Sequence, residues 1–391
     1  MKFSVVLTTT RPHLLRESLC VALAIDHDDF EIVVSDNSKE GSEDFVRSFN
    51  SPHVRYVRPE GPMRVAAHWE FAFGQALGDW VLQLCDDDAI TPNILAILDQ
   101  QIAEHPDVQA ICWNYGVYRR SGHWSRKDQI GIGDFSGKAT VYDAKELLAE
   151  MFDSGTGLFQ IKAKIPFYPR CAIRRDLQDA IRSRQGGLFH RFCPMTSGAA
   201  AVLSFADRTL HLDMPLTVLG ETEDSIAGWV VNPAPVTAYI EGTEVELAPV
   251  KLARILPTGQ AEALLRTQRA MPERLGQYKL NLVNNFLHCY FFIREGEGRG
   301  MNMDDCWPSY NDALAKMPAD FQARVATLAE QHLAMKTPSA FAQFKHFVRT
   351  KLDGVLPAKL PGEANANRLG LHDIVACAAY VGAMIDRKQT V

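Results

Sequence analysis

The sequence of 391 residues predicts an α/β fold, with a mostly parallel sheet flanked by helices and an all-helical carboxyl-terminal part. Two observations carry this prediction. Short apolar runs of strand length alternate with amphipathic helical patterns over the first 110 residues, which is typical of doubly wound parallel sheets. From about Ala248 onward, helical patterns punctuated by prolines replace that alternation.

Four apolar segments are predicted as strands of the sheet, each followed by a turn or a helical pattern. They are residues 3–7, 31–35, 53–58 and 80–85. Among the intervening helices, the second is expected to begin after an N-cap at Ser42. Gly78 is expected to end the third helix in the left-handed conformation. Thr91 and Pro92 are expected to open the fourth, as N-cap and first helical residue.

Three adjacent carboxylates, those of Asp86, Asp87 and Asp88, directly follow the strand 80–85. Such a cluster of like charges is unfavourable unless a cation offsets it. The carboxyl ends of strands in an open α/β sheet are also where ligands bind. Carboxylate oxygens suit Mg²⁺ or Mn²⁺, ions that bind through one or two carboxylates and substrate phosphates. The run is therefore interpreted as a metal–diphosphate site, with a solvated acidic turn as the alternative.

Two other predicted strands end in polar turns, residues 8–11 and 36–38. Right-handed crossovers bring the carboxyl ends of parallel strands to one edge of the sheet, so these turns are expected beside the acidic run. No Gly-x-Gly-x-x-Gly follows the first strand, and no Gly-x-x-x-x-Gly-Lys-Ser/Thr occurs. Their absence argues against a dehydrogenase and against a P-loop enzyme.

Composition narrows the class of protein further. A net charge of −6 gives no support to a nucleic-acid-binding surface, so no nucleic-acid partner is expected. No run approaches the ~18 apolar residues that a transmembrane helix needs, and the amino terminus lacks a signal-peptide pattern. The eight cysteines are dispersed, which indicates reduced thiols and no zinc site. These features predict a cytoplasmic protein; peripheral contact at the inner membrane face and homo-oligomer formation stay open.

Four segments match a known family in content, order and spacing. They read Ser-Val-Val-Leu-Thr-Thr-Thr-Arg-Pro (4–12), Ile-Val-Val-Ser-Asp-Asn-Ser (32–38), His-Trp-Glu-Phe-Ala-Phe (68–73) and Gly-Asp-Trp-Val-Leu-Gln-Leu-Cys-Asp-Asp-Asp (78–88). These segments resemble the family 2 nucleotide-sugar glycosyltransferases of GT-A (Rossmann-like) fold. The resemblance is specific over the first 110 residues, fainter to about residue 235 and absent beyond. We expect a donor-binding half (1–110), an acceptor-binding half (111–245) and a helical domain (246–391).

The resemblance implies roles for the residues that would meet the nucleotide base. Thr8, Thr10 and Arg11 would line the base pocket. Asp36 would accept a hydrogen bond from the base, commonly uracil in this family, with Asn37 beside it. Each of these turns also has a plainer interpretation, as a helix cap or an Asx turn.

The resemblance also implies roles at the ribose and the diphosphate. Arg64 would lie near the base or the diphosphate, with a surface charge as the alternative. Asp86 would meet the ribose, and Asp87 would belong to the same donor site. Asp88, together with Asp86, would bind Mn²⁺ or Mg²⁺ as in the family's Asp-x-Asp motif.

The position of the family's general base is occupied by Met195. In the resembling transferases, the segment at Pro194 reads Pro-Asp, and that Asp deprotonates the acceptor hydroxyl. Methionine cannot take a proton, so another group is expected to serve. The alternatives are a shifted alignment in this region and a protein that binds a sugar nucleotide without transferring it. The candidate bases nearest in sequence are Glu221, Glu223, Asp224 and His190.

The carboxyl-terminal part is expected to be helical throughout. The predicted helices are 260–270, 273–294, 308–317, 319–335, 338–352 and 371–386. The basic amphipathic segment 338–352 is expected to pack against the next helix, with binding to anionic lipid as the alternative. The run 374–385 is apolar on all sides and is expected inside the helical bundle or at a subunit interface.

The expected function is metal-dependent transfer of a sugar from a nucleotide donor, UDP-linked, to a glycan or a small hydroxyl acceptor. Such transfers serve cell-surface polysaccharide or glycoconjugate synthesis. The main alternative is a non-catalytic sugar-nucleotide sensor or scaffold. A nucleotidyltransferase is disfavoured because no glycine- and lysine-rich loop follows the first strand.

Overall fold

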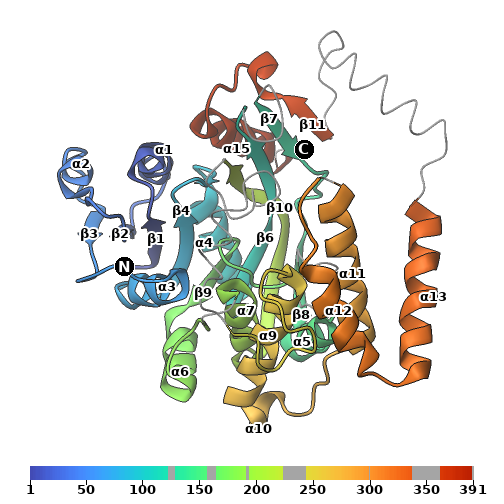
Figure 1. Ribbon diagram of the computed structural model, residues 1–391. Coiled ribbons are helices and arrows are strands. Elements are labelled where there is room, and N and C mark those ends of the chain that lie inside the picture. The colour runs from blue at the N-terminus through green and yellow to red at the C-terminus, as the bar shows by residue number, and fades with distance from the viewer. Residues whose placement is uncertain are drawn as a thin grey trace.

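A mixed sheet of eleven strands forms the centre of the described structure (Figure 1). Eight strands follow the order β11-β7-β6-β9-β4-β1-β2-β3, and β10 pairs with β5, β6 and β8. Two apolar cores lie on the two faces of this sheet, each covered by helices. The computed structural model describes residues 1–121, 128–155, 164–190, 193–222, 244–298, 300–336 and 362–389.

The amino-terminal strands are parallel and confirm the predicted alternation. They are β1 (Phe3–Thr9), β2 (Phe30–Asp36), β3 (Val54–Val57) and β4 (Trp80–Cys85). The helices are α1 (Pro12–Leu23), α2 (Glu43–Arg47), α3 (Val65–Gly74) and α4 (Ile94–Glu104). Every residue of β1 is buried, because the strand is central in the sheet and is covered on both faces. Thr8 stands opposite Ser35 of β2 and Cys85 of β4, so three carboxyl-terminal strand ends are level.

Beyond β4 the sheet is mixed rather than mostly parallel. The strands are β5 (Ala89–Ile90), β6 (Ala110–Arg119), β7 (Gln129–Ile132), β8 (Ala139–Asp143), β9 (Cys171–Arg174) and β10 (Arg208–Glu221). The helices are α5 (Ala144–Asp153), α6 (Arg175–Gln185) and α7 (Pro194–Phe205). β9 lies antiparallel between β4 and β6, whereas β10 runs parallel to β6. The α/β class with flanking helices is confirmed.

Strand β10 is a single long strand with an irregularity near its middle. Its ladder with β6 shifts register between Leu212 and Pro215 and again between Pro215 and Thr217. Proline has no N–H to donate to the ladder, so the irregularity occurs at Pro215. The strand nevertheless continues to Glu221.

Gly78 does not end α3 as expected. The helix stops at Gly74, and the φ of Gly78 does not lie in the left-handed region. A Cβ at Gly78 would lie 2.5 Å from the carbonyl carbon of Phe3 and 2.6 Å from the nitrogen of Ser4. The glycine therefore serves the close approach of the chain to β1.

The start of α4 also differs from the prediction. The helix begins at Ile94 with Asn93 as its N-cap, two residues after the expected Thr91 and Pro92. The N–H of Thr91 donates to the carbonyl of Leu216 at 3.0 Å, so this residue is tied to β10. Ser42 does precede α2, but its side chain makes no capping hydrogen bond.

A group of helices follows β10 and packs on α7 and α5 (Figure 1). These are α9 (Leu256–Ala270), α10 (Pro272–Leu275), α11 (Leu282–Gly298), α12 (Cys306–Ala315) and α13 (Ala319–Lys336). The predicted helix 273–294 is divided into α10 and α11. The predicted amphipathic helix 338–352 lies outside the described residues.

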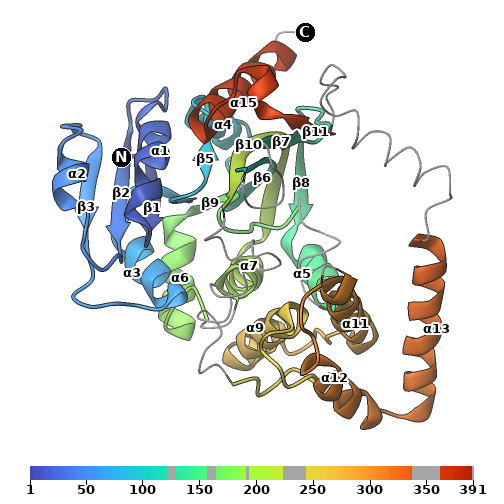
Figure 2. The ribbon, with the colours of Figure 1, turned by 45° about the horizontal axis from the view of Figure 1, so that its top comes forward.

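The chain then returns to the sheet, where it forms β11 (Gly362–Asn365), the 3-10 turn η2 (Ala366–Leu369) and α15 (Ile374–Gln389). The carboxyl-terminal part is therefore not all-helical, because β11 adds a strand to the sheet. The prediction that 374–385 lies in the helical bundle is wrong, whereas its alternative, a subunit interface, stays a prediction. The helix instead covers α1, β5 and β10, and its apolar side chains belong to the core opposite that of α7 and α9 (Figure 2).

Within the described ranges, no helix is long and apolar enough to cross a bilayer. The division at residues 110 and 245 stays a prediction.

Candidate active site

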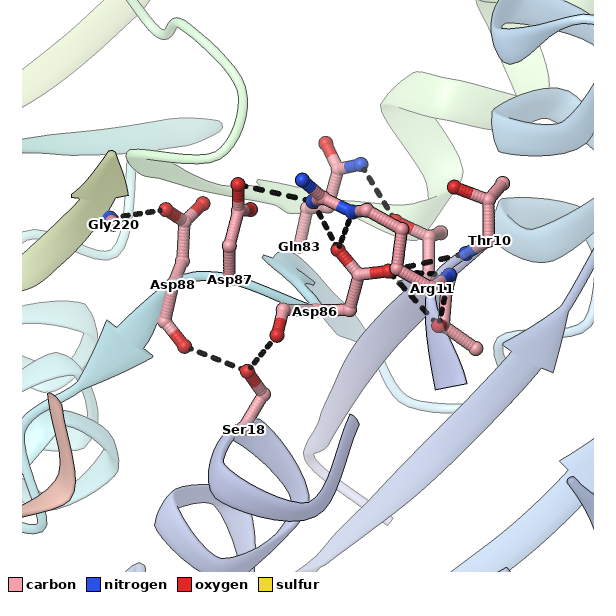
Figure 3. Close-up of polar contacts among 10 residues, drawn as sticks. Thr10, Arg11, Ser18, Gln83, Asp86, Asp87, Asp88 and Gly220 are labelled. Carbon is pink, nitrogen blue, oxygen red and sulfur yellow. Dashed lines mark hydrogen bonds and ion pairs between the residues drawn. The ribbon is translucent and has the colours of Figure 1, made fainter. Parts of the chain in front are cut away.

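The carboxylate of Asp86 is bound by the turn that joins β1 to α1 (Figure 3). Its Oδ2 accepts from Thr9 Oγ1 at 2.9 Å, from the N–H of Thr10 at 3.1 Å and from the N–H of Arg11 at 3.0 Å. Its Oδ1 accepts from Arg11 Nε at 3.1 Å and from Arg11 Nη2. Five hydrogen bonds thus engage both oxygens of a side chain that is 3% exposed.

Arg11 is the cation of the acidic run. Besides Asp86, its Nη2 pairs with Asp87 Oδ2 at 2.9 Å. Burial alone would lower the pKa of Arg11, but the charges of Asp87 and Asp86 outweigh it and raise that pKa. The guanidinium therefore stays charged and pairs with two of the three carboxylates, leaving the run with a net negative charge.

Asp88 has a different environment. Its Oδ1 accepts the N–H of Gly220, at the end of β10, at 2.9 Å, and its side chain is 5% exposed. Burial, together with the neighbouring charge of Asp87, raises the pKa of Asp88 well above its usual range. A buried carboxylate of this kind is stabilised by a proton or by a cation.

The side chains of Asp87 and Asp88 lie side by side, and Asp87 also pairs with Arg11 (Figure 3). Among the described residues, no three His, Cys, Asp or Glu side chains form a metal site unaided. Mg²⁺ and Mn²⁺ do not require one, because they bind through one or two carboxylates and fill the shell with water and substrate phosphate oxygens. The two aspartates suit that mode of binding.

Two residues outside the acidic run hold its backbone. Ser18 Oγ lies 2.7 Å from the carbonyl oxygen of Asp86 and 3.0 Å from that of Asp88. A Cβ at Gly220 would lie 1.7 Å from the carbonyl oxygen of Asp87, so only glycine fits there. Sequence reasoning missed both. Ser18 had a signal, as a polar residue on the buried face of α1, whereas the requirement at Gly220 arises from a turn 132 residues away.

Asp36 ends β2 beside the acidic turn and is fully buried. Its Oδ1 accepts the N–H of Ser38 at 2.8 Å, and its Oδ2 accepts the hydroxyl of Tyr56 at 3.0 Å. Burial would raise the pKa of Asp36, but these hydrogen bonds lower it below its ordinary value, so the group is ionised. Asn37 exchanges two hydrogen bonds with the backbone of Met63, at 2.8 and 2.9 Å, and holds the segment before α3.

A pocket of about 320 Å³ opens beside Asp36, a volume within the range of small-molecule sites. Its lining residues are Asp36, Asn37, Ser38, Lys39, Arg58, Pro59, Glu60, Gly61 and Pro62. Arg64 follows this lining as the exposed N-cap of α3. Thr8 is buried inside the sheet, where Gln83 Nε2 lies 3.4 Å from its Oγ1, whereas Thr10 is exposed at the turn.

His68 of α3 lies against the sheet between these groups. Its Nε2 is 2.9 Å from Ser35 Oγ, and its side chain is 2% exposed. Burial lowers the pKa of His68 from 6.5 to about 4. The imidazole is therefore neutral in the folded protein at neutral pH.

This burial of His68 predicts a pH dependence of stability. Between pH 6.5 and about 4 the unfolded chain binds a proton at this position while the folded protein does not. Stability present above pH 6.5 is thus lost as the pH falls toward 4, by about 3 kcal/mol. Urea unfolding across this range is expected to show a smaller decline for His68→Gln than for the wild type. His13→Gln, an exposed histidine of α1, is the control; equal declines in both variants would contradict the assignment.

The family model described as Glycosyl transferase family 2 matches residues 4–178. This segment is a glycosyl transferase family 2 domain. The protein is accordingly a glycosyltransferase, and the GT-A fold expected from the sequence is confirmed.

One solved structure supports the fold of the transferase, and two others show a weaker similarity. S. aureus TarS 1–349 in complex with UDP-GlcNAc is 16% identical, with a TM-score of 0.50 and 84% of each chain covered. A second structure of S. aureus TarS 1–349 is 17% identical, with a TM-score of 0.46, covering 85% of this chain and 92% of that one. Mannosyltransferase PcManGT from Pyrobaculum calidifontis, in complex with GDP-Man and Mn²⁺, is 16% identical, with a TM-score of 0.38 and coverage of 86% and 88%. No curated protein sequence matches the chain.

The candidate bases of the transferase lie in unlike settings. Glu221 is the residue after Gly220, and its Oε2 pairs with Arg119 Nε at 2.6 Å. His190 precedes α7; its N–H donates to Ser197 Oγ at 2.9 Å, and burial, aided by the charge of Arg266, lowers its pKa.

The position of the family's base and two of the candidate bases add no titratable group to the described structure. Met195, the second residue of α7, is half-buried and packs against the apolar core. Asp224 and Glu223 lie outside the described residues. The identity of the base stays a prediction.

Proposed function

We propose that this glycosyltransferase uses a nucleoside-diphosphate sugar, UDP-linked, and transfers the sugar to a hydroxyl of a glycan or a small molecule with the aid of Mn²⁺ or Mg²⁺. The observation that carries the proposal is the pair of aspartates, Asp87 and Asp88, beside the fixed guanidinium of Arg11 at the carboxyl edge of the sheet. This edge is where ligands of open α/β sheets bind.

The pocket beside Asp36 is the proposed site of the base. An ionised carboxylate accepts a hydrogen bond from the ring N–H that uracil carries, and its two present partners fix its orientation. Asn37 contributes indirectly, because both polar atoms of its amide are engaged with Met63. Thr8 and Thr10 remain proposed neighbours of the base, and Arg64 of the base or diphosphate.

Asp88, with Asp87, is the proposed metal ligand. When bound, the cation would offset the negative charge that develops on the leaving nucleoside diphosphate. We assign Asp86 a different role from the predicted one at ribose and metal, because five hydrogen bonds already engage its two oxygens. Asp86 would orient Arg11, whose guanidinium adds positive charge beside the diphosphate.

The acceptor is proposed at the level of a class, a hydroxyl compound of cell-surface polysaccharide or glycoconjugate synthesis. Deprotonation of its hydroxyl is assigned to Glu221, which directly follows the Gly220 contact with the acidic run. Asp224 and His190 are the other candidates, and single replacement of each by an uncharged residue would rank them by loss of kcat.

A panel of nucleotide sugars tests the donor. We expect UDP-sugars with Mn²⁺ to raise the thermal unfolding temperature, and UDP-GlcNAc is the first compound because the TarS fragment was solved with it. GDP-sugars and UDP-sugars without metal are the matched controls. Equal stabilisation by GDP- and UDP-sugars would contradict the UDP assignment. The same rise in unfolding temperature with and without Mn²⁺ would contradict the proposed role of the metal.

Turnover is then measured as release of UDP in the presence of hydroxyl acceptors. Metal-dependent release that rises with acceptor concentration is the expected result. Stabilisation by the donor without any release of UDP, across glycan and small-molecule acceptors, would contradict the proposed transfer and favour a binding protein.

A further inference from the structure

The segment 362–389 returns to the donor-binding part of the sheet across a large separation in sequence. β11 pairs antiparallel with β7, and α15 then packs against β10, β5 and α1 (Figure 1). Asn93 Nδ2, at the start of α4, donates to Asp386 Oδ1 at 2.6 Å across 293 residues. The helix therefore lies directly beside the stretch of chain that follows the aspartates.

The buried face of α15 is apolar and belongs to the core under the acidic run. Its members are Ile374, Cys377, Ala378, Val381 and Ile385, all at most 2% exposed. They share this core with Ala89 and Ile90 of β5, and with Leu216 and Val218 of β10. The two strands that flank the aspartates in space are thus supported by one helix.

Ile374 is the residue of this face that lies beside Gly220, at the end of β10. A Cβ placed on Gly220 would lie 3.2 Å from Ile374 Cδ1 and 1.7 Å from the carbonyl oxygen of Asp87. Ile374 and the acidic run therefore both crowd the same side of Gly220, the side on which a side chain would stand. In that position the N–H of Gly220 donates to Asp88 Oδ1 at 2.9 Å.

We infer that Ile374 is a positioning residue of the donor site, which fixes the orientation of the Asp88 carboxylate through Gly220. The inference rests on the proposed role of Asp88 in metal binding. Groups that orient a metal ligand from behind contribute to metal affinity although they never touch the ion. A shortened side chain at 374 would leave space beside Gly220, so the end of β10 could shift toward α15 and the hydrogen bond from Gly220 to Asp88 would lose its geometry.

A matched pair of variants separates this role from general stabilisation. Ile374→Ala and Ile385→Ala remove the same atoms from buried positions of the same helix. Ile385 lies about three turns, or about 16 Å, further along the axis. Both variants are expected to lower the thermal unfolding temperature, because each leaves a cavity. Where either fails to fold, Ile374→Val and Ile385→Val provide the same comparison with a smaller cavity.

The measurement is binding of Mn²⁺ in the presence of saturating UDP, followed by loss of the free Mn²⁺ spin resonance signal. We expect Ile374→Ala to weaken Mn²⁺ binding about tenfold, and Ile385→Ala to leave it within about twofold of the wild type. The same affinity in both variants would overturn the inference while leaving the proposed function intact. No binding of Mn²⁺ with UDP by the wild-type protein would overturn the proposed function and the inference with it.

Discussion

Replacement of Asp88 by asparagine is expected to lower kcat on the order of a thousandfold without loss of the fold. Asparagine keeps the shape of the side chain and an oxygen that accepts the N–H of Gly220, but it loses the charge that a divalent cation requires. Because a buried carboxylate is costly to ionise, the neutral amide is not expected to destabilise the protein. Release of UDP and thermal unfolding, measured on the same preparation, check both parts.

Asp79→Asn is the control for this variant. Asp79 directly precedes β4, its side chain is 72% exposed, and its nearest cation is Arg175 at 3.7 Å. Its replacement removes one negative charge at the end of β4 opposite the aspartates and is expected to leave kcat unchanged. Turnover by Asp88→Asn close to that of the wild type would exclude Asp88 as the metal ligand and would remove the main support of the proposed function.

Replacement of Arg11 by methionine is expected to lower the free energy of unfolding by about 3 to 5 kcal/mol. The change leaves Asp86 and Asp87, whose side chains are 3% and 10% exposed, without the guanidinium that pairs with both. Methionine retains much of the apolar stem, so the loss reports the charge rather than the packing. Urea unfolding at neutral pH measures the effect.

Two further variants test whether this loss of stability comes from the unpaired carboxylates. Arg16→Met, on the exposed face of α1 with its guanidinium 5.0 Å from the ring centre of Phe45, is expected to cost less than about 1 kcal/mol. Adding Asp86→Asn to Arg11→Met is expected to recover part of the loss, because one buried charge is removed with its partner. A cost for Arg11→Met no greater than that for Arg16→Met would show that another group compensates the aspartates.

The elements that depend on local sequence could be predicted. β1, β2 and β4 are largely apolar runs because both of their faces are covered. The start of α5 is also local, because Asp143 and Glu146 form an Asp-x-x-Glu pattern and the Asp143 carboxylate accepts the N–H groups of Lys145 and Glu146. These features need only a few neighbouring residues, and the sequence displays them.

The elements that depend on distant residues could not be predicted. Nothing within β9 indicates that it lies antiparallel between β4 and β6, since four apolar residues fit either direction. The apolar run of α15 indicated burial but not against what, so its position on α1 and β10 was missed. The choice among possible partners is made by the whole chain.

The candidate site also combines features that the sequence predicts with features that depend on distant residues. The topology predicted that the turns after β1, β2 and β4 meet, and Thr9, Arg11 and Asp86 do meet there. The topology did not predict that other residues of the protein donate hydrogen bonds to both carboxylate oxygens of Asp86. Sequence spacing indicates which residues lie close together, but not how many hydrogen bonds each one makes. Gly220 was invisible for a related reason, since the residue that excludes a side chain there is Asp87 of a distant turn.

The position of α15 has a consequence for synthesis of the chain. A ribosome makes β1 to β4 and the three aspartates early, but the helix that completes the core beneath them emerges only with residues 374–389. Until then the apolar surfaces of α1, β5 and β10 lack their cover, and contacts of such high sequence separation form slowly. The nascent transferase is therefore expected to expose an apolar surface next to the proposed donor site, and such surfaces are prone to aggregation.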